Sequence, residues 1–246
     1  MKSINLSLAA IAAMSMFSVA NASSLSEALK SGKVSGDISV TYEKRSQDKE
    51  LNDYYSNTEY SVGSIGLAYE TAKLNNFSAV MGVRAYKVLF EDDKKSKSGN
   101  GDASERFYKD GKNQTVELEK AYLAYDLDNL HIKAGRQFIS TEWINKNQDA
   151  IRLDAKILPN TDVEFIWTAR HGRTFSRDYR PMTDVNAVNE NAGLYKLGLT
   201  QALTDSLSAK AYALTAPSLK DIYGGKVTLK TDAFTAMAHY AQTSED

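Results

Sequence analysis

The sequence predicts an all-β fold, namely an antiparallel transmembrane β-barrel built as a meander of hairpins. Three observations predict it: an export signal at the N-terminus, segments that alternate apolar and polar side chains, and connections that alternate between long loops and tight turns. No apolar run after the N-terminal segment is long enough for a membrane helix, so a helical membrane protein is excluded. A barrel fits the mean hydropathy of −0.43, because its lipid-facing residues alternate with polar ones.

The N-terminus carries the features of a secretory signal peptide. Lys2 supplies the positive charge, residues 4–19 form an apolar core, and Ala20-Asn21-Ala22 is a small-x-small cleavage site. We expect residues 1–22 to be removed and the mature chain to begin at Ser23; the alternative is an uncleaved N-terminal helix. The absence of cysteine excludes disulfides, thiolate metal sites and a lipid anchor at the cleavage site.

A short helix is expected at residues 23–32, at the periplasmic entrance to the barrel. Leu25, Ala28 and Leu29 share one helical face, and Gly32 stands where a C-cap residue belongs. We expect residues 33–246 to form one partial β-barrel domain.

About eleven strands are expected after the helix, each about ten residues long, as a tilted membrane strand needs. In residues 161–170, for example, Val163, Phe165 and Trp167 alternate with Glu164 and Thr168. Fourteen tyrosines and only three prolines suit an antiparallel sheet with aromatic interfaces. The expected strands are residues 34–42, 59–70, 77–90, 116–126, 130–138, 148–157, 161–170, 192–201, 206–214, 223–230 and 234–242.

The connections between these strands alternate in length. Long polar loops are expected at residues 45–58, 91–115, 139–147 and 171–191, with a shorter one at residues 215–221. Tight turns rich in Asn, Asp and Pro are expected at residues 71–76, 127–129, 158–160, 202–205 and 231–232. Long loops on one side and short turns on the other favour an outer-membrane barrel over the alternative, a soluble β-sandwich.

Composition and motifs argue against several classes of function. A formal net charge of −1 does not suit a general nucleic-acid binder. Neither G-x-S-x-G nor H-E-x-x-H occurs, and His131, His171 and His239 lie on separate elements, so we expect no enzyme. The polar stretch at residues 91–111 holds acids and glycines without the spacing of an EF-hand, so no metal site and no cofactor are expected.

Three segments carry a resemblance to a known family. SSLSEALKSGKVSGDISVTYEKR, YSVGSIGLAYETAKLNNFSAVMGVRAY and LEKAYLAYDLDNLHIKAGRQFI resemble OprD-type outer-membrane porins, most closely those of ε-proteobacteria, and the resemblance covers residues 23–213. It implies an eighteen-stranded barrel that passes small, often charged solutes, performs no catalysis and lines one wall with a ladder of basic residues. Family members end in an aromatic residue, so the resemblance also implies a C-terminally truncated fragment that lacks about seven strands.

Charged residues opposite the apolar faces are the candidate pore lining. A charge in a narrow aqueous pore acts strongly on a passing ion, because low-dielectric walls focus its field. The alternative for each residue is pairing with a neighbouring acid or simple solvation. The candidates are Arg84, Lys120, Lys133, Arg152, Asp154, Lys156, Glu164, Arg170, Lys196 and Lys210.

Arg136 is a further pore-lining candidate that departs from the pattern. Its parity matches Leu130, Ile132 and Ala134, which would direct it to lipid at a cost of about 2–4 kcal/mol near the midplane. A bulge at Gly135 would turn it inward, or it lies above the lipid near the rim. The Gly-Arg-Gln match to the family favours a lumen or rim role.

Residues 171–191 contain a basic loop cluster made of Arg173, Arg177 and Arg180. The loop either folds inward and narrows the pore or binds the phosphates of surface lipopolysaccharide; a solvated loop is the alternative.

Taken together, these features predict a porin of the bacterial outer membrane, exported through the periplasm, that lets small charged solutes diffuse through a lumen lined with basic residues. Its expected partners are the lipid bilayer, lipopolysaccharide and small charged solutes, but no nucleic acid, and a homotrimer is possible as in other porins. The alternative is a structural or adhesive barrel with little conductance, whose lumen would be filled by side chains. A soluble exported β protein is the third candidate.

Overall fold

A computed structural model describes residues 21–45, 58–92, 107 and 114–244. These residues form one helix, α1 (Leu25–Lys30), and twelve strands. The strands are β1 Lys33–Arg45, β2 Thr58–Glu70, β3 Phe77–Glu91, β4 Gln114–Leu127, β5 Leu130–Thr141, β6 Ile144–Leu158, β7 Thr161–Phe175, β8 Asp178–Asp184, β9 Leu194–Ala202, β10 Leu207–Ala216, β11 Lys220–Lys230 and β12 Thr235–Thr243.

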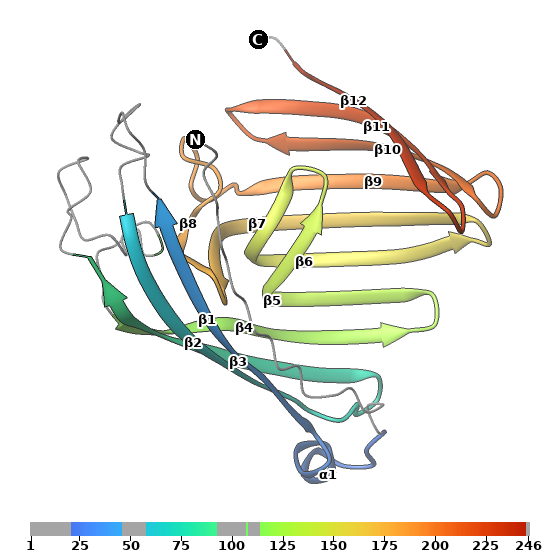
Figure 1. Cartoon of the computed structure of the whole chain (residues 1–246). Coiled ribbons are helices and arrows are strands. Elements are labelled where there is room, and N and C mark those ends of the chain that lie inside the picture. The colour runs from blue at the N-terminus through green and yellow to red at the C-terminus, as the bar shows by residue number, and fades with distance from the viewer. Residues whose placement is uncertain (1–20, 46–57, 93–106, 108–113, 245–246) are drawn as a thin grey trace. The chain divides into compact units, whose positions relative to one another are not determined.

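The strands hydrogen-bond to one another in the order of the sequence, and β8, which pairs with β7, is the one departure from this path (Figure 1). The chain divides into two compact units. The first unit comprises Met1–Lys73, Val80–Ala121 and Gly172–Met182, and the second comprises Leu74–Ala79, Tyr122–His171 and Thr183–Asp246. Within each unit the pairs with a described register are antiparallel, so the prediction of an antiparallel meander is confirmed.

All eleven expected segments coincide with strands, but the predicted connections were wrong in three places. The short strand β8 lies inside the expected loop at residues 171–191. The expected loop at residues 139–147 is a two-residue turn between β5 and β6, and the expected loop at residues 215–221 shortens to three residues. In these places polar residues continue the strands, because antiparallel pairing needs backbone groups and not apolar side chains. The expected loops at residues 45–58 and 91–115 fall largely outside the described residues.

Each unit sorts its side chains onto two unlike faces. In the first unit, Val34, Ile38 and Val40 of β1 are exposed, whereas Ser39 and Thr41, which alternate with them, are buried. In the second unit, Leu197 of β9 is 55% exposed and its neighbour Lys196 only 1%. We call these the apolar face and the polar face of the strands. A soluble sheet in water would bury the first and expose the second, so this inversion matches a barrel in lipid.

Small apolar clusters lie on the polar face of both units. In the first unit the cluster contains Tyr60, Val62, Tyr86, Phe107 and Tyr179. In the second it contains Ile139, Ile144, Ala150, Ile166 and Leu214. This second cluster packs the end of the β5–β6 hairpin against β7 and β10.

The helix α1 lies within the range expected for it. Ser24 caps the helix by accepting a hydrogen bond from the Glu27 backbone N–H at 3.2 Å. The expected apolar face is only partly used: Ala28 is buried, while Leu25 and Leu29 are exposed. The C-cap is Ser31 and not Gly32. Residues 1–20 of the expected signal peptide lie outside the described residues. The described part of the chain contains no helix that could cross a membrane.

Candidate functional site

The charged side chains of the polar face gather into one set in each unit. In the first unit the centre is Arg84 on β3, whose side chain is 5% exposed. Its two terminal nitrogens donate to both carboxylate oxygens of Asp37 on β1, at 2.8 and 2.6 Å. The guanidinium also lies 3.4 Å from Glu119 and from the Ser64 hydroxyl. A two-pronged pair of this kind fixes the direction of the arginine and neutralises much of its charge.

A pocket of about 360 Å³ opens beside this pair. Asp37, Arg84, Glu119, Lys120 and Ser176 are among the residues that line it. The stem of Lys120 crosses Gly82 closely, since a Cβ atom there would lie 2.9 Å from the lysine Cγ. The expected residues Arg84 and Lys120 therefore share one pocket, together with acids that the sequence analysis did not single out.

In the second unit the site is organised by the turn of the β5–β6 hairpin. Figure 1 shows the far ends of β5 and β6 bent out of line with the rest of these strands. Gly135 on β5 has a φ of 125°, a conformation that residues with a side chain rarely adopt. Beyond it, Ile139 and Ile144 pack against Ile166 and Leu214, so the hairpin end lies on the polar face of β7 and β10.

The turn directs one carboxylate at three lysines. Glu142 accepts hydrogen bonds from Lys196 on β9 at 2.9 Å, from Lys210 on β10 at 2.7 Å and from Lys226 on β11. We call Lys196, Lys210 and Lys226 the lysine row. Glu164 on β7 is a second acid for the row, 2.7 Å from Lys196 and 3.2 Å from Lys210.

Glu142 stays ionised in this setting. It lies in the turn, outside the strands, and its side chain is 6% exposed. Burial by itself would raise the pKa of Glu142, but the hydrogen bonds from Lys210, Lys226 and Lys196 outweigh it and hold the pKa well below its usual range.

The neighbouring residue Trp143 fastens the turn to the sheet. Its indole N–H donates to the Tyr212 hydroxyl at 2.7 Å, and that hydroxyl lies 2.7 Å from Nε2 of His239 on β12. An indole can only donate, so the Tyr212 oxygen accepts from Trp143 and its own proton is left for His239. The Tyr212 ring lies directly over Gly224, where a Cβ atom would be 2.3 Å from the phenol carbon and oxygen.

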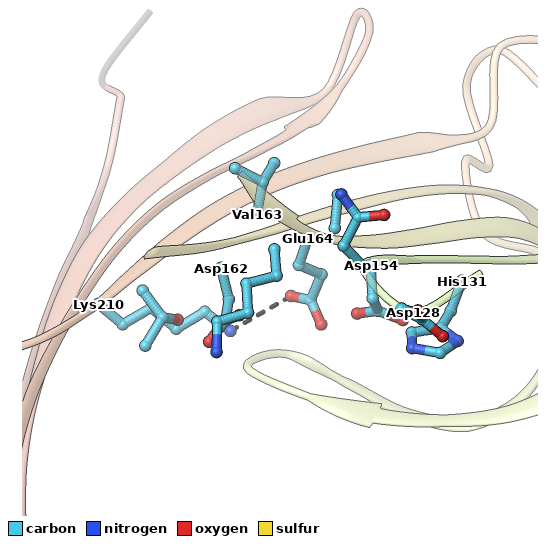
Figure 2. Close-up of a pocket in the computed structure, with 11 residues that line it drawn as sticks. Asp128, His131, Asp154, Asp162, Val163, Glu164 and Lys210 are labelled. Carbon is cyan, nitrogen blue, oxygen red and sulfur yellow. Dashed lines mark hydrogen bonds and ion pairs between the residues drawn. The ribbon is translucent and has the colours of Figure 1, made fainter. Parts of the chain in front are cut away.

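A second pocket, also of about 360 Å³, adjoins the lysine row and is rich in acids. Figure 2 shows Glu164 with Lys210 on one side and Asp154 and His131 on the other. Arg152 binds Asp154 at 2.7 and 2.9 Å and reaches Glu164 at 3.3 Å. Lys156 belongs to the same lining. The expected residues Arg152, Asp154, Lys156, Glu164 and Lys210 thus meet around this pocket.

Other expected residues lie apart from both sets. Arg136 binds Asp149 directly across the β5–β6 ladder, at 2.7 and 2.9 Å. The register of that ladder is unbroken, so the bulge considered at Gly135 is absent. Lys133 lies 5.3 Å above the ring of Tyr122, and Arg170 lies 3.8 Å from Asp184.

Two members of the basic loop cluster form ion pairs with one aspartate. Arg173 and Arg180 both pair with Asp178, at 2.6 and 3.2 Å. Arg180 also donates to the Phe107 carbonyl at 2.6 Å, while Arg177 is exposed at the turn between β7 and β8.

Several important residues escaped the sequence analysis. The alternation of apolar and polar residues could have identified Lys226, because it precedes the apolar Val227 in an expected strand. Glu142 and Trp143 had no such signal, because they stood in an expected loop. Among the described residues, no three His, Asp or Glu side chains are grouped in a way that could hold a metal ion.

Comparison with known proteins gives a family and a fold. The model of the family "Campylobacter major outer membrane protein" matches residues 1–234. No curated protein matches the chain. Among solved structures, Acinetobacter baumannii OccAB4 has a TM-score of 0.62 at 12% identity, over 87% of this chain and 60% of that one.

Two further structures agree with this fold. OccAB2 of Acinetobacter baumannii has a TM-score of 0.64 at 13% identity, over 89% of this chain and 59% of that one. A structure of OccD1 (OprD) has a TM-score of 0.52 at 9% identity, over 77% of this chain and 47% of that one. The chain therefore spans about half to three-fifths of the length of the structures it resembles.

Proposed function

The chain belongs to the Campylobacter major outer membrane protein family, and from this premise we propose that it forms a passive channel for small charged solutes. The family and the fold confirm the expected OprD-type resemblance, the β-barrel class and the bacterial outer membrane as the location. Passage through the periplasm after removal of residues 1–22 is part of the proposal.

The observation that carries the proposal is the crowding of charges on the polar face. Lys196, Lys210 and Glu164 of the second unit, like Arg84 of the first, lie opposite side chains that suit lipid. A water-filled lumen requires such a surface, whereas a barrel filled by side chains has no need of it. The proposed pore lining is Arg84, Lys120, Lys133, Arg136, Arg152, Asp154, Lys156, Glu164, Arg170, Lys196 and Lys210.

Ion pairs with aspartates reduce the positive charge that the arginines bring to the proposed lumen. Arg84, Arg136 and Arg152 each bind an aspartate two-pronged, so much of their charge is neutralised within the wall. The lysine row keeps an excess of positive charge, because three ammonium groups there face two carboxylates. We therefore assign the preference for anions to the lysine row.

One observation favours the second candidate, a structural or adhesive barrel with little conductance. The β5–β6 hairpin brings Ile139 and Ile144 onto the polar face, where they occupy space that water would fill in an open channel. Arg177 is exposed, but the neighbouring turn residue Ser176 lines the pocket of Arg84 on the polar face, so this turn suits narrowing of the pore better than contact with lipopolysaccharide. Contact with lipopolysaccharide and assembly into a homotrimer are proposed for either candidate.

Planar-bilayer conductance of the full-length protein, refolded in detergent, tests the proposal. Discrete ohmic steps are expected, with a reversal potential in a salt gradient that reports a preference for anions. The control for folding is heat-modifiable migration in SDS gels. A folded protein that inserts into the bilayer and stays silent would contradict the channel and favour the structural barrel.

A further inference from the structure

We propose that Glu142 is a tethered counter-ion, which occupies the lysine row and leaves it open to a solute carboxylate only when the tip of the β5–β6 hairpin moves away. The inference rests on the proposed channel and deepens it by naming a residue that sets its selectivity. It makes the hairpin tip, Thr141 to Ile144, a gate for anions within the second unit.

The contacts of Glu142 are those that a bound carboxylate would make. Three ammonium groups from three neighbouring strands converge on its two oxygens, two at 2.9 and 2.7 Å on Oε2 and the third on Oε1. The Thr141 hydroxyl adds a hydrogen bond to Oε2 at 2.8 Å. A carboxylate arriving from solution offers the same two oxygens, so it competes with Glu142 for the same donors.

Burial makes the lysine row dependent on an anion. The side chain of Lys196 is 0% exposed and that of Lys210 is 13% exposed. With Glu142 in place the three ammonium groups of the row face two carboxylates, and without it they face only Glu164. Buried ammonium groups that lose a partner are strongly disfavoured, so withdrawal of Glu142 favours capture of another anion.

The attachment of the hairpin tip is suited to reversible movement. Trp143 has a φ of 68°, which is unfavourable for a residue with a side chain and persists only where its surroundings enforce it. Its indole keeps one hydrogen bond, to Tyr212, yet the residue is 60% exposed. The tip is therefore fixed by a few polar contacts and two isoleucines, without deep burial of the tryptophan.

Glu142→Gln in the full-length protein tests the inference. The amide keeps the size of the side chain but removes its charge, so the reversal potential in a potassium chloride gradient should shift toward chloride. We expect the permeability ratio of chloride to potassium to rise on the order of threefold, because one unit charge is added to the polar face of the pore. Glu190→Gln is the matched control, since it removes the same charge from an exposed loop position.

A second measurement decides the inference even if the channel is silent. A ligand that binds only the folded state raises its melting temperature, and the rise is larger when the ligand binds more tightly. Acetate, compared with chloride at equal concentration, should raise the temperature of heat modification more in Glu142→Gln than in the wild type or Glu190→Gln. Should Glu142→Gln fail to fold, Trp143→Ala replaces it, because it keeps every charge, loosens the tip and should give the same shifts at smaller size.

The outcomes separate the two proposals. A conducting wild type whose variant shows neither a selectivity shift nor an added response to acetate overturns the role of Glu142 and leaves the channel standing. A silent wild type with a larger acetate response in the variant overturns the channel and supports the carboxylate site.

Discussion

At the scale of single residues, the polar face is built from charges that are buried and paired. Arg84 is the clearest case, since a guanidinium that is 5% exposed meets both oxygens of Asp37. In a soluble protein such a side chain would lie at the surface. Here the apolar face of the strand suits lipid, and Arg84 lies on the opposite, polar face. The pair therefore contributes to stability as a unit, and removal of one member leaves the other without compensation.

We predict that Arg84→Ala destabilises the folded protein by about 1.5–3 kcal/mol, the usual contribution of hydrogen bonds to a charged group. The loss falls on Asp37, which keeps its charge but loses both donors. Urea titration in detergent, followed by heat-modifiable migration, measures the change. Arg177→Ala is the control at an exposed position. An equal loss of unfolding free energy in the two variants would show that the pair of Arg84 with Asp37 does not stabilise the fold.

Parity along the strands predicted much of the site but not its partners. Alternation with apolar neighbours placed Lys196 and Lys210 opposite the apolar residues, which is where they lie. The same rule is silent about which acid each lysine meets, because that depends on the register and on side chains that cross a strand. Glu142 lay beyond its reach altogether, since the turn that carries it bends out of the strand direction.

At the scale of elements, the β5–β6 hairpin departs most from a regular meander. Its ladder stays in register from Leu130 to Thr141, so no residue is inserted in β5, and Gly135 has a positive φ within it. The bent end contacts Tyr212 and the ring of His239 through Trp143, and the lysine row through Glu142. The space for this arrangement comes from Gly224, which lets the Tyr212 ring lie flat on β11.

We predict that Gly224→Ala loosens the hairpin tip while Gly225→Ala does not. A Cβ atom at position 224 would lie 2.3 Å from the Tyr212 ring, whereas one at position 225 meets nothing closer than 3.6 Å. Displacing the ring breaks two hydrogen bonds of about 1 kcal/mol each, so amide exchange of the tip should accelerate on the order of tenfold. Hydrogen–deuterium exchange of the peptide at residues 139–147 measures this, and equal rates in the two variants would refute the role of Tyr212.

The expected strands and the observed strands agree because the period of two survives wherever one face meets lipid. It fails at β8 and at the start of β6, where Asn145 and Asn147 carry polar side chains into a strand. There apolar and polar side chains do not alternate, so the pattern gives no signal and only backbone pairing defines the strand.

At the scale of the whole molecule, the inverted sorting of side chains is the property that connects the sequence to the membrane. Each unit shows it separately, with exposed leucine, isoleucine and valine on one face and buried polar side chains on the other. The family match and the similar solved structures lead to the same class of protein.

We predict that Leu197→Arg impairs folding into lipid while Leu203→Arg is tolerated. Both leucines are 55% exposed, but Leu197 lies in the middle of β9 and Leu203 in the turn that follows it. Arginine on a lipid-facing strand costs about 2–4 kcal/mol near the midplane and about 0–1 kcal/mol near the interface. Folding yield in lipid vesicles, read by heat modification, distinguishes the two, and equal yields would mean that the apolar face of β9 does not meet lipid.

The contacts made by the Gly172–Met182 segment in the first unit have a consequence for the order of assembly. The paired strands with a described register are close in sequence, so their hairpins can close early at small entropic cost. By contrast, the Ser64 hydroxyl donates to the Ser176 carbonyl across 112 positions, and Tyr86 to the Phe175 carbonyl across 89. Contacts between residues so far apart in the sequence are expected to form last, after the hairpins that lie between them have formed.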